Sequence, residues 1–220
     1  MANRPLHFLW LLDCSSSMSI NGKIGELNFA IREAIPEMQQ AAQDNPSAAL
    51  MVRAISFATG ATWHIDEATP VEQFSWTDLT TYGGTDMGAA FRLAAKALQS
   101  PPMPDRALRP VVALVSDGQP MDDWRAGLRE IDATPWGKRA MRVAVAIGED
   151  ADKDMLKEFL GNPELEPLQA RNPRQLVAAI RWASTVAVKA ASTPKTDGAQ
   201  QPPAASTLSF DKQADDEDVW

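Results

Sequence analysis

The sequence is poor in the residues that build disulfide frameworks and nitrogen- or sulfur-rich metal sites. Its 220 residues include one cysteine, Cys14, and two histidines, His7 and His64. A single cysteine forms no internal disulfide, which agrees with a reducing compartment. We interpret Cys14 as a small buried residue, with a nucleophile as the alternative, and both histidines as satisfied structural groups within apolar strands rather than as ligands.

Positive charge and long apolar runs are also scarce. Lys and Arg number 21 against 29 Asp and Glu, which gives a net charge of −8 and a pI near 4.8. A nucleic-acid surface would need a basic patch, so we expect no nucleic-acid partner. No apolar run is long enough to span a bilayer, and the amino terminus lacks the pattern of a secretory signal. The sequence therefore predicts a cytoplasmic protein without a membrane partner.

Oxygen-bearing side chains follow the first apolar run of the chain. Residues 6–12 (LHFLWLL) are short and uniformly apolar, as in a strand buried on both faces of a parallel sheet. The run ends in Asp13-Cys14-Ser15-Ser16-Ser17. Ligands of open α/β sheets bind beyond the carboxyl ends of the strands, where this run delivers one carboxylate and two hydroxyls in an Asp-x-Ser-x-Ser pattern.

Two later segments carry similar groups. Gly83-Gly84-Thr85 is a glycine-rich loop that opens a predicted helix, and the apolar run 111–115 ends in Ser116-Asp117-Gly118. Oxygen-only ligand sets suit hard cations. We therefore predict a site for Mg²⁺, with Mn²⁺ and Ca²⁺ as alternatives. The competing interpretation is that these residues are only turn formers and helix caps.

These three motifs together resemble the metal-ion-dependent adhesion site of the von Willebrand factor A (vWA) family. The matching positions are Asp13, Ser15, Ser17, Thr85 and Asp117. The resemblance implies that Ser15 and Ser17 bind the ion directly and Thr85 directly or through water, while Asp13 and Asp117 hold the coordinating waters and hydroxyls. It also implies a non-catalytic interaction module, in which an Asp or Glu of a partner protein completes the coordination of the metal.

The family's fold is a Rossmann-like, doubly wound α/β domain with a mostly parallel sheet, one antiparallel edge strand, and helices on both faces. Residues 11–18 and 115–124 are similar to the bacterial TerY-type proteins associated with tellurium resistance. That similarity implies an adaptor or scaffold in a stress-response phosphorylation system, with a protein kinase and a metal-dependent phosphatase as partners.

Periodicity places the remaining elements. We expect a helix over 23–43 with a kink or local break at Pro36, and an antiparallel hairpin of strands 49–57 and 62–66. Further helices are expected over 86–99, from about 122, from about 152 to Gly161, and from Pro173 after an Asn172 cap. Further strands are expected over 111–115, 142–147 and 165–168.

Three interpretations stay open in the sequence. Asp86 is either an extra carboxylate near the ion or a cap of the following helix. Trp124 is either a core residue or part of a rim that a partner touches. The alternative function is a Mg²⁺-dependent phosphatase or phosphotransferase of the haloacid-dehalogenase type using Asp13, but that chemistry needs a second carboxylate at the position of Ser15.

The composition changes beyond about residue 190. We assign residues 1–190 to the vWA domain and 191–220 to a disordered linker rich in Pro, Ala and Gln that ends in an acidic tail. The tail contains Asp215-Asp216-Glu217-Asp218. It either serves solubility or places a carboxylate on the metal of its own domain or of a neighbouring copy.

Overall fold

The computed structural model describes residues 4–192. The predicted acidic tail, and all of the predicted linker beyond Ser192, lie outside the described residues. No helix within residues 4–192 is long and apolar enough to cross a membrane.

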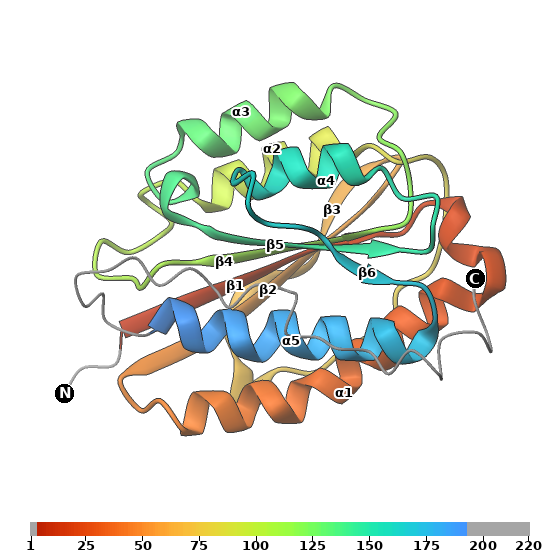
Figure 1. Cartoon of the computed structure of the whole chain (residues 1–220). Helices are drawn as coiled ribbons and strands as arrows, with labels where there is room; N and C mark the ends of the chain where they lie inside the picture. Colours follow the sequence, from red (N-terminus) through yellow and green to blue (C-terminus); the bar gives the residue numbers. More distant parts are fainter. Residues whose placement is uncertain (1–3, 193–220) are drawn as a thin grey trace.

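A six-stranded sheet forms the centre of the molecule, as Figure 1 shows. Its strands are β1 (Arg4–Asp13), β2 (Ala48–Ala58), β3 (Gly60–Pro70), β4 (Val111–Ser116), β5 (Met141–Ile147) and β6 (Leu168–Ala170). They lie in the order β3-β2-β1-β4-β5-β6, and only the β2–β3 pair is antiparallel. The predicted doubly wound α/β fold with one antiparallel edge strand is confirmed.

Helices cover both faces of the sheet (Figure 1). Helices α1 (Lys23–Gln43) and α5 (Pro173–Ser192) pack on one face, and α2 (Met87–Ala97), α3 (Trp124–Ala133) and α4 (Lys153–Leu160) pack on the other. Side chains of a strand alternate between faces, so Phe8 and Trp10 of β1 contribute to the first core and Leu9 and Leu11 to the second. Three short 3₁₀ turns, Ser16–Gly22, Val71–Gln73 and Gly137–Arg139, complete the elements.

Most predicted elements lie within a few residues of their expected positions. Helix α1 spans the predicted range with Pro36 inside it, so the predicted local break does not occur. The last strand is Leu168–Ala170 rather than 165–168, because its register follows the pairing of Leu168 with Val145 of β5. Gly161 ends α4 in the left-handed conformation (φ 67°), and Asn172 caps α5 through a 2.9 Å hydrogen bond from the Gln175 N–H.

The carboxyl ends of the parallel strands lie together at one edge of the sheet, on the right of Figure 1. At this edge β1 ends in Asp13 and β4 is followed directly by Asp117, both residues of the predicted metal site. Helix α1 starts at this edge, and α5 ends at the opposite one. The fold therefore gathers the polar loops at one end of the molecule.

Candidate metal-ion site

Three loops meet at this edge and carry the predicted site residues. Loop 1 (residues 14–22) follows β1, loop 2 (residues 79–86) precedes α2, and loop 3 (residues 117–123) follows β4. Loop 1 is joined to loop 2 by the Ser16 N–H, which donates to the Gly83 carbonyl at 3.1 Å. Loop 3 is joined to loop 2 by the Met121 N–H, which donates to the Thr85 carbonyl at 2.9 Å. Backbone hydrogen bonds thus hold the three loops next to one another.

The two serines of the Asp-x-Ser-x-Ser motif bring their hydroxyls together. The Oγ atoms of Ser15 and Ser17 are 2.9 Å apart, and the Ser17 hydroxyl donates to Asp117 Oδ1 at 2.8 Å. Asp117 follows β4 and lies a hundred residues further along the chain than Ser17. A carboxylate that accepts from a hydroxyl turns the lone pairs of the hydroxyl oxygen away from itself. Those lone pairs are then available to a cation.

Asp13 lies beneath the hydroxyls and is completely buried. Its Oδ1 accepts the Ser15 N–H at 2.8 Å, and its Oδ2 accepts the Ser116 hydroxyl at 2.5 Å. Burial raises the pKa of Asp13 to about 6, with a smaller contribution in the same direction from Asp117, while the bonds from Ser116 and Ser15 act in the opposite direction. A cation near this carboxyl would favour its ionised form.

Thr85 completes the set from loop 2. It is buried, and Gly118 of loop 3 lies against it. A Cβ atom on Gly118 would lie 3.3 Å from Thr85 Oγ1 and 3.6 Å from Asp13 Oδ2. Because Gly118 has no side chain, its backbone fits close to both the Thr85 hydroxyl and the Asp13 carboxyl group. The structure brings all five predicted residues together.

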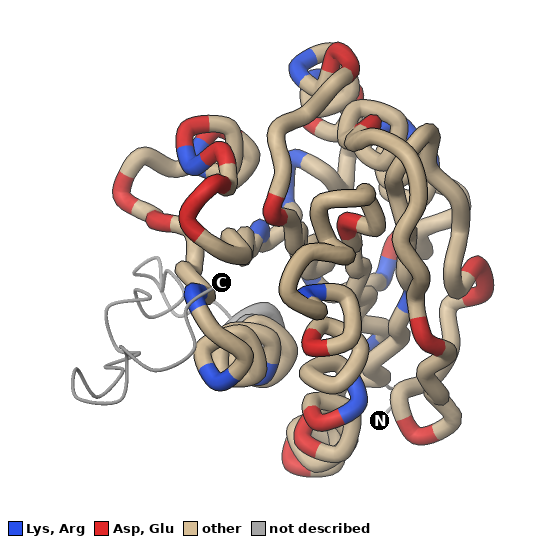
Figure 2. Tube along the Cα trace, turned by 90° about the vertical axis from the view of Figure 1, so that its right-hand side faces the viewer, with Lys and Arg blue, Asp and Glu red and all other residues tan. Residues whose placement is uncertain are grey.

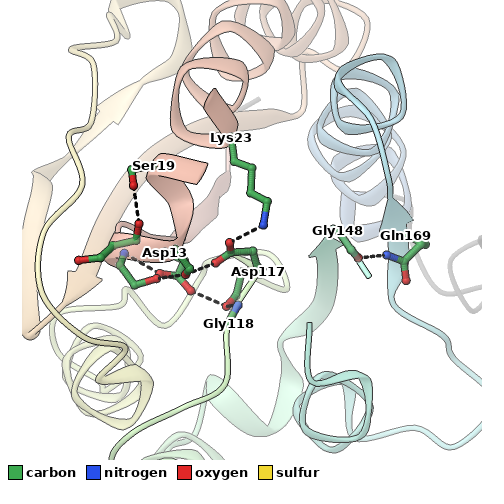
Figure 3. Close-up of polar contacts among 11 residues, drawn as sticks. Asp13, Ser19, Lys23, Asp117, Gly118, Gly148 and Gln169 are labelled. Carbon is green, nitrogen blue, oxygen red and sulfur yellow. Dashed lines mark hydrogen bonds and ion pairs between the residues drawn. The ribbon is translucent and has the colours of Figure 1, made fainter. Parts of the chain in front are cut away.

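Lys23 is a site residue that the sequence reasoning missed. Its Nζ lies 2.8 Å from Asp117 Oδ2, and both side chains are buried (Figure 3). The ammonium group also lies near Gly148 at the end of β5. In the sequence Lys23 is simply the first residue of an amphipathic helix, and nothing local indicates a partner 94 residues away. Ser116, the donor to Asp13, was also missed, although its place beside Asp117 was a usable signal.

The donor set fits a hard cation. Adjacent ligands of octahedral Mg²⁺, each about 2.1 Å from the ion, lie about 3.0 Å apart, and the Ser15 and Ser17 oxygens are close to that separation, at 2.9 Å. Within residues 4–192, no cluster of three or more His, Cys, Asp or Glu is placed to hold a metal. The candidate ligands are therefore chiefly hydroxyls, and Lys23 already balances one of the two carboxylates. A divalent ion held this way keeps net positive charge and several waters.

Asp86 does not cap the following helix with its side chain, as one of its two interpretations predicted. Its Oδ2 instead accepts the Gly60 N–H at 2.8 Å, which ties loop 2 to the start of β3. Asp122 of loop 3 caps α2, accepting the N–H groups of Gly88 and Ala89 at 2.8 and 2.9 Å. The carboxylate that stabilises the start of this helix thus comes from a different loop.

The remaining candidates are structural. Cys14 is buried, and burial raises the pKa of its thiol to about 12, which disfavours a nucleophile. Trp124 is buried in the core rather than on a rim. His64 contacts the Thr77 carbonyl at 2.8 Å, as expected of a satisfied group. His7 differs, because its buried Nε2 has no hydrogen-bond partner within residues 4–192, and burial lowers its pKa to about 4.

The phosphotransferase alternative gains no support from this geometry. Ser15, at the position where a second carboxylate would act as general acid and base, presents a hydroxyl, which lies 2.9 Å from the hydroxyl of Ser17. Both oxygens of Asp13 already accept hydrogen bonds, from Ser15 and Ser116. A nucleophilic carboxylate would need one oxygen directed at a substrate.

Comparison of the sequence with models of known protein families finds none that matches, and no curated protein matches significantly. The fold has many counterparts among solved structures. A vWA protein from Catenulispora acidiphila has 18% identity and a TM-score of 0.59, with 86% of this chain and 43% of that protein covered. The ArnB paralog VWA2 from Sulfolobus acidocaldarius has 17% identity and a TM-score of 0.57, with 81% and 44% covered.

A third neighbour carries a metal. Proximal thread matrix protein 1 from the mussel byssus, solved with a zinc-occupied MIDAS motif, has 13% identity and a TM-score of 0.64. The alignment covers 86% of this chain and 49% of that protein. This chain thus spans less than half the length of each of the three proteins, and at such identities the likeness concerns the fold. The chain has the α/β fold of von Willebrand factor A domains.

Proposed function

We propose that this chain is a metal-dependent protein-interaction module. In this proposal the hydroxyls of Ser15, Ser17 and Thr85 hold a divalent ion of the Mg²⁺ type, and Asp13 and Asp117 orient those hydroxyls and the bound waters. The observation that carries the proposal is the 2.9 Å separation of the Ser15 and Ser17 oxygens, together with the hydrogen bond that the Ser17 hydroxyl donates to Asp117. The zinc-occupied MIDAS motif of the byssus protein, which shares this fold, supports a divalent metal here.

An acidic side chain of a partner protein is the ligand that suits such an ion. Lys23 neutralises Asp117, so the ion keeps more of its positive charge than it would between two free carboxylates. Asp or Glu from a partner supplies an anionic oxygen in place of a water. The bound ion would contribute electrostatic attraction for a carboxylate, and no covalent step follows from it.

Calorimetry with Mg²⁺ and Mn²⁺ tests the metal site directly. We expect binding by the wild type and its loss in Ser17→Ala, which removes one hydroxyl ligand. Ser19→Ala is the matched control, because Ser19 lies in the same loop but its hydroxyl donates to the Ser16 carbonyl rather than to a site carboxylate. Equal metal binding by Ser17→Ala and Ser19→Ala would refute the proposed site.

Acetate then tests the open coordination position. Water-proton relaxation of the Mn²⁺-loaded protein should fall as acetate displaces bound water, and Lys23→Met should weaken this effect by freeing Asp117 as a competing carboxylate. We also propose that the module is non-catalytic. Phosphatase activity on p-nitrophenyl phosphate that Ser17→Ala abolishes would contradict this.

We further propose a biological setting for this module. The motif resemblance around Asp13 and Asp117 supports an adaptor in a cytoplasmic, tellurium-resistance-associated phosphorylation system, with a protein kinase and a metal-dependent phosphatase as partners. Such partners should bind the purified wild type in Mg²⁺ and lose affinity in EDTA and in Ser17→Ala. Binding that is equal in EDTA would exclude a metal-mediated contact with them.

A further inference from the structure

Exposed apolar side chains gather around the candidate metal site. Within residues 4–192, four large hydrophobic side chains are exposed: Ile20 (56%), Phe29 (47%), Tyr82 (42%) and Met121 (75%). Single exposed hydrophobics are ordinary on a protein surface. Here, however, three of the four lie on the three site loops, with Ile20 on loop 1, Tyr82 on loop 2 and Met121 on loop 3. We call these three residues the apolar rim.

The hydrogen bonds between the loops hold the apolar rim around the site. The Tyr82 N–H donates to the Cys14 carbonyl at 2.8 Å, one residue from Asp13. The Met121 side chain lies over Gly84, so close that a Cβ there would be 3.0 Å from its sulfur. Ile20 belongs to the 3₁₀ turn that begins at Ser16. Each of the three loops therefore carries one exposed apolar side chain in addition to its residues of the candidate site.

The charge of this end of the molecule restricts what can bind there. Figure 2, which looks onto the site edge, shows acidic residues on several of the loops. An acidic ligand is repelled by such a surface unless a bound cation offsets the charge. The surface therefore suits a carboxylate that reaches the ion, followed closely by bulky apolar side chains that cover the rim.

We propose that the metal site and the apolar rim together bind the chain's own segment Asp215–Trp220. This segment contains four acidic residues followed directly by Val219 and Trp220, and so combines both features within six residues. The proposal rests on the proposed metal-dependent function. In it, one carboxylate of the segment ligates the ion, Val219 and Trp220 cover the apolar rim, and an outside acidic partner has to displace them.

The length of the intervening chain permits this contact. Helix α5 ends at the edge of the sheet opposite the site (Figure 1) and, with 20 residues, is about 30 Å long. Residues 193–214 provide 22 residues, whose full extension is about 73 Å. Tethering gives the segment an effective concentration in the millimolar range, so even a weak contact would be substantially occupied.

A peptide of residues 211–220 is the probe for this contact. It is titrated in Mg²⁺ into a full chain whose own segment is neutralised by D215N, D216N, E217Q and D218N. We expect binding that EDTA abolishes and that Met121→Ser weakens about fivefold, the equivalent of about 1 kcal/mol. Phe29→Ser is the matched control, since Phe29 is also an exposed hydrophobic residue but belongs to α1 rather than to the three loops, and it should leave the affinity unchanged. The wild-type chain should bind the peptide at least tenfold more weakly, because its own segment competes.

The outcomes separate this inference from the proposed function. Mg²⁺ binding without peptide binding overturns the inference and leaves the metal site standing, whereas absence of Mg²⁺ binding overturns both. If Met121→Ser and Phe29→Ser change the affinity for the peptide equally, a contact between the peptide and the apolar rim is ruled out. Sedimentation of the wild type that reveals a Mg²⁺-dependent dimer, lost on neutralising the segment, would assign the segment to a second copy rather than to its own domain.

Discussion

At the scale of single residues, the site pairs buried carboxyls with hydrogen-bond donors from other elements. Asp13 accepts from Ser15 and Ser116, and Asp117 accepts from Ser17 and Lys23. Such pairing offsets only part of the cost of burying a charge. The incomplete compensation is visible at Asp13, whose pKa burial raises from 3.8 to about 6. A bound divalent ion would offset the rest of the cost of burying this charge.

Asp13 should make the metal-free protein less stable as the pH rises. Between about pH 4 and 6 the folded state keeps a proton on Asp13 that the unfolded state has lost, so the free energy of unfolding falls with pH and levels off above 6. A shift of about two pKa units corresponds to about 3 kcal/mol. Relative to Asp13→Asn, the wild type in EDTA should lose roughly that amount between pH 4 and 7.5 in urea unfolding.

The difference between the two variants is the quantity to measure, because His7 acts in the opposite direction. Its lowered pKa makes the protein more stable as the pH rises from about 4 to 6.5, in both variants alike. A wild-type minus Asp13→Asn difference that does not change with pH would contradict the assigned role of burial at Asp13.

Replacing Lys23 by methionine should lower the stability of the protein and raise its affinity for Mg²⁺. Lys23→Met leaves the buried Asp117 carboxylate without its countercharge, which should cost roughly 3 kcal/mol in EDTA. The freed carboxylate should then bind Mg²⁺ more tightly than the wild type does in calorimetry. Lys96→Met, at an exposed position, is the control for loss of a positive charge. Weaker Mg²⁺ binding by Lys23→Met would show that Lys23 supports the ion instead.

At the scale of elements, the position of α2 governs where Thr85 lies. Asp122 caps the helix from loop 3, and α2 contacts α3 through two glycines, Gly88 and Gly127. A Cβ on Gly127 would lie 2.5 Å from the Gly88 carbonyl oxygen and 2.9 Å from the Cβ of Phe91. The absence of side chains thus allows the close approach of the two helices.

Alanine at Gly127 should therefore separate α2 from α3. We expect Gly127→Ala to cost roughly 2 to 3 kcal/mol in urea unfolding, because the added methyl group meets backbone rather than a flexible side chain. Gly25→Ala is the matched control, since a Cβ at this exposed position in α1 meets nothing within 4 Å. It should stabilise the protein by about 0.5 to 1 kcal/mol. Similar effects of both substitutions would contradict the proposed contact.

At the scale of the whole molecule, the doubly wound sheet collects three distant segments at one end. A ligand that binds only the folded state stabilises it by mass action, by about 2.7 kcal/mol at a concentration of 100 times its Kd. The free energy of unfolding of the wild type should therefore rise with the logarithm of the Mg²⁺ concentration. Ser17→Ala should remain flat over the same range, and a parallel rise in this variant would indicate binding elsewhere.

The sequence was most informative where one segment contains its own signal. The run 6–12 followed by Asp13, Ser15 and Ser17 identifies a buried strand and a polar loop without reference to the rest of the chain. It was least informative where a partner comes from elsewhere. The Lys23–Asp117 pair, the contact of Asp86 with Gly60, and the register of β6 against β5 all depend on how distant elements pack. The periodicity of apolar residues does not indicate which distant elements pack together.

The Lys23 ammonium supplies positive charge beside the buried Asp117 carboxylate in the absence of an ion. Because Lys23 already pairs with Asp117, we expect the candidate metal site to fold before any ion binds. Metal would then act on a finished fold, in contrast to small zinc domains that need their ion in order to fold. A chelator would abolish partner binding by such a protein without unfolding it. Adding the ion back would restore binding as fast as the ion diffuses to the site.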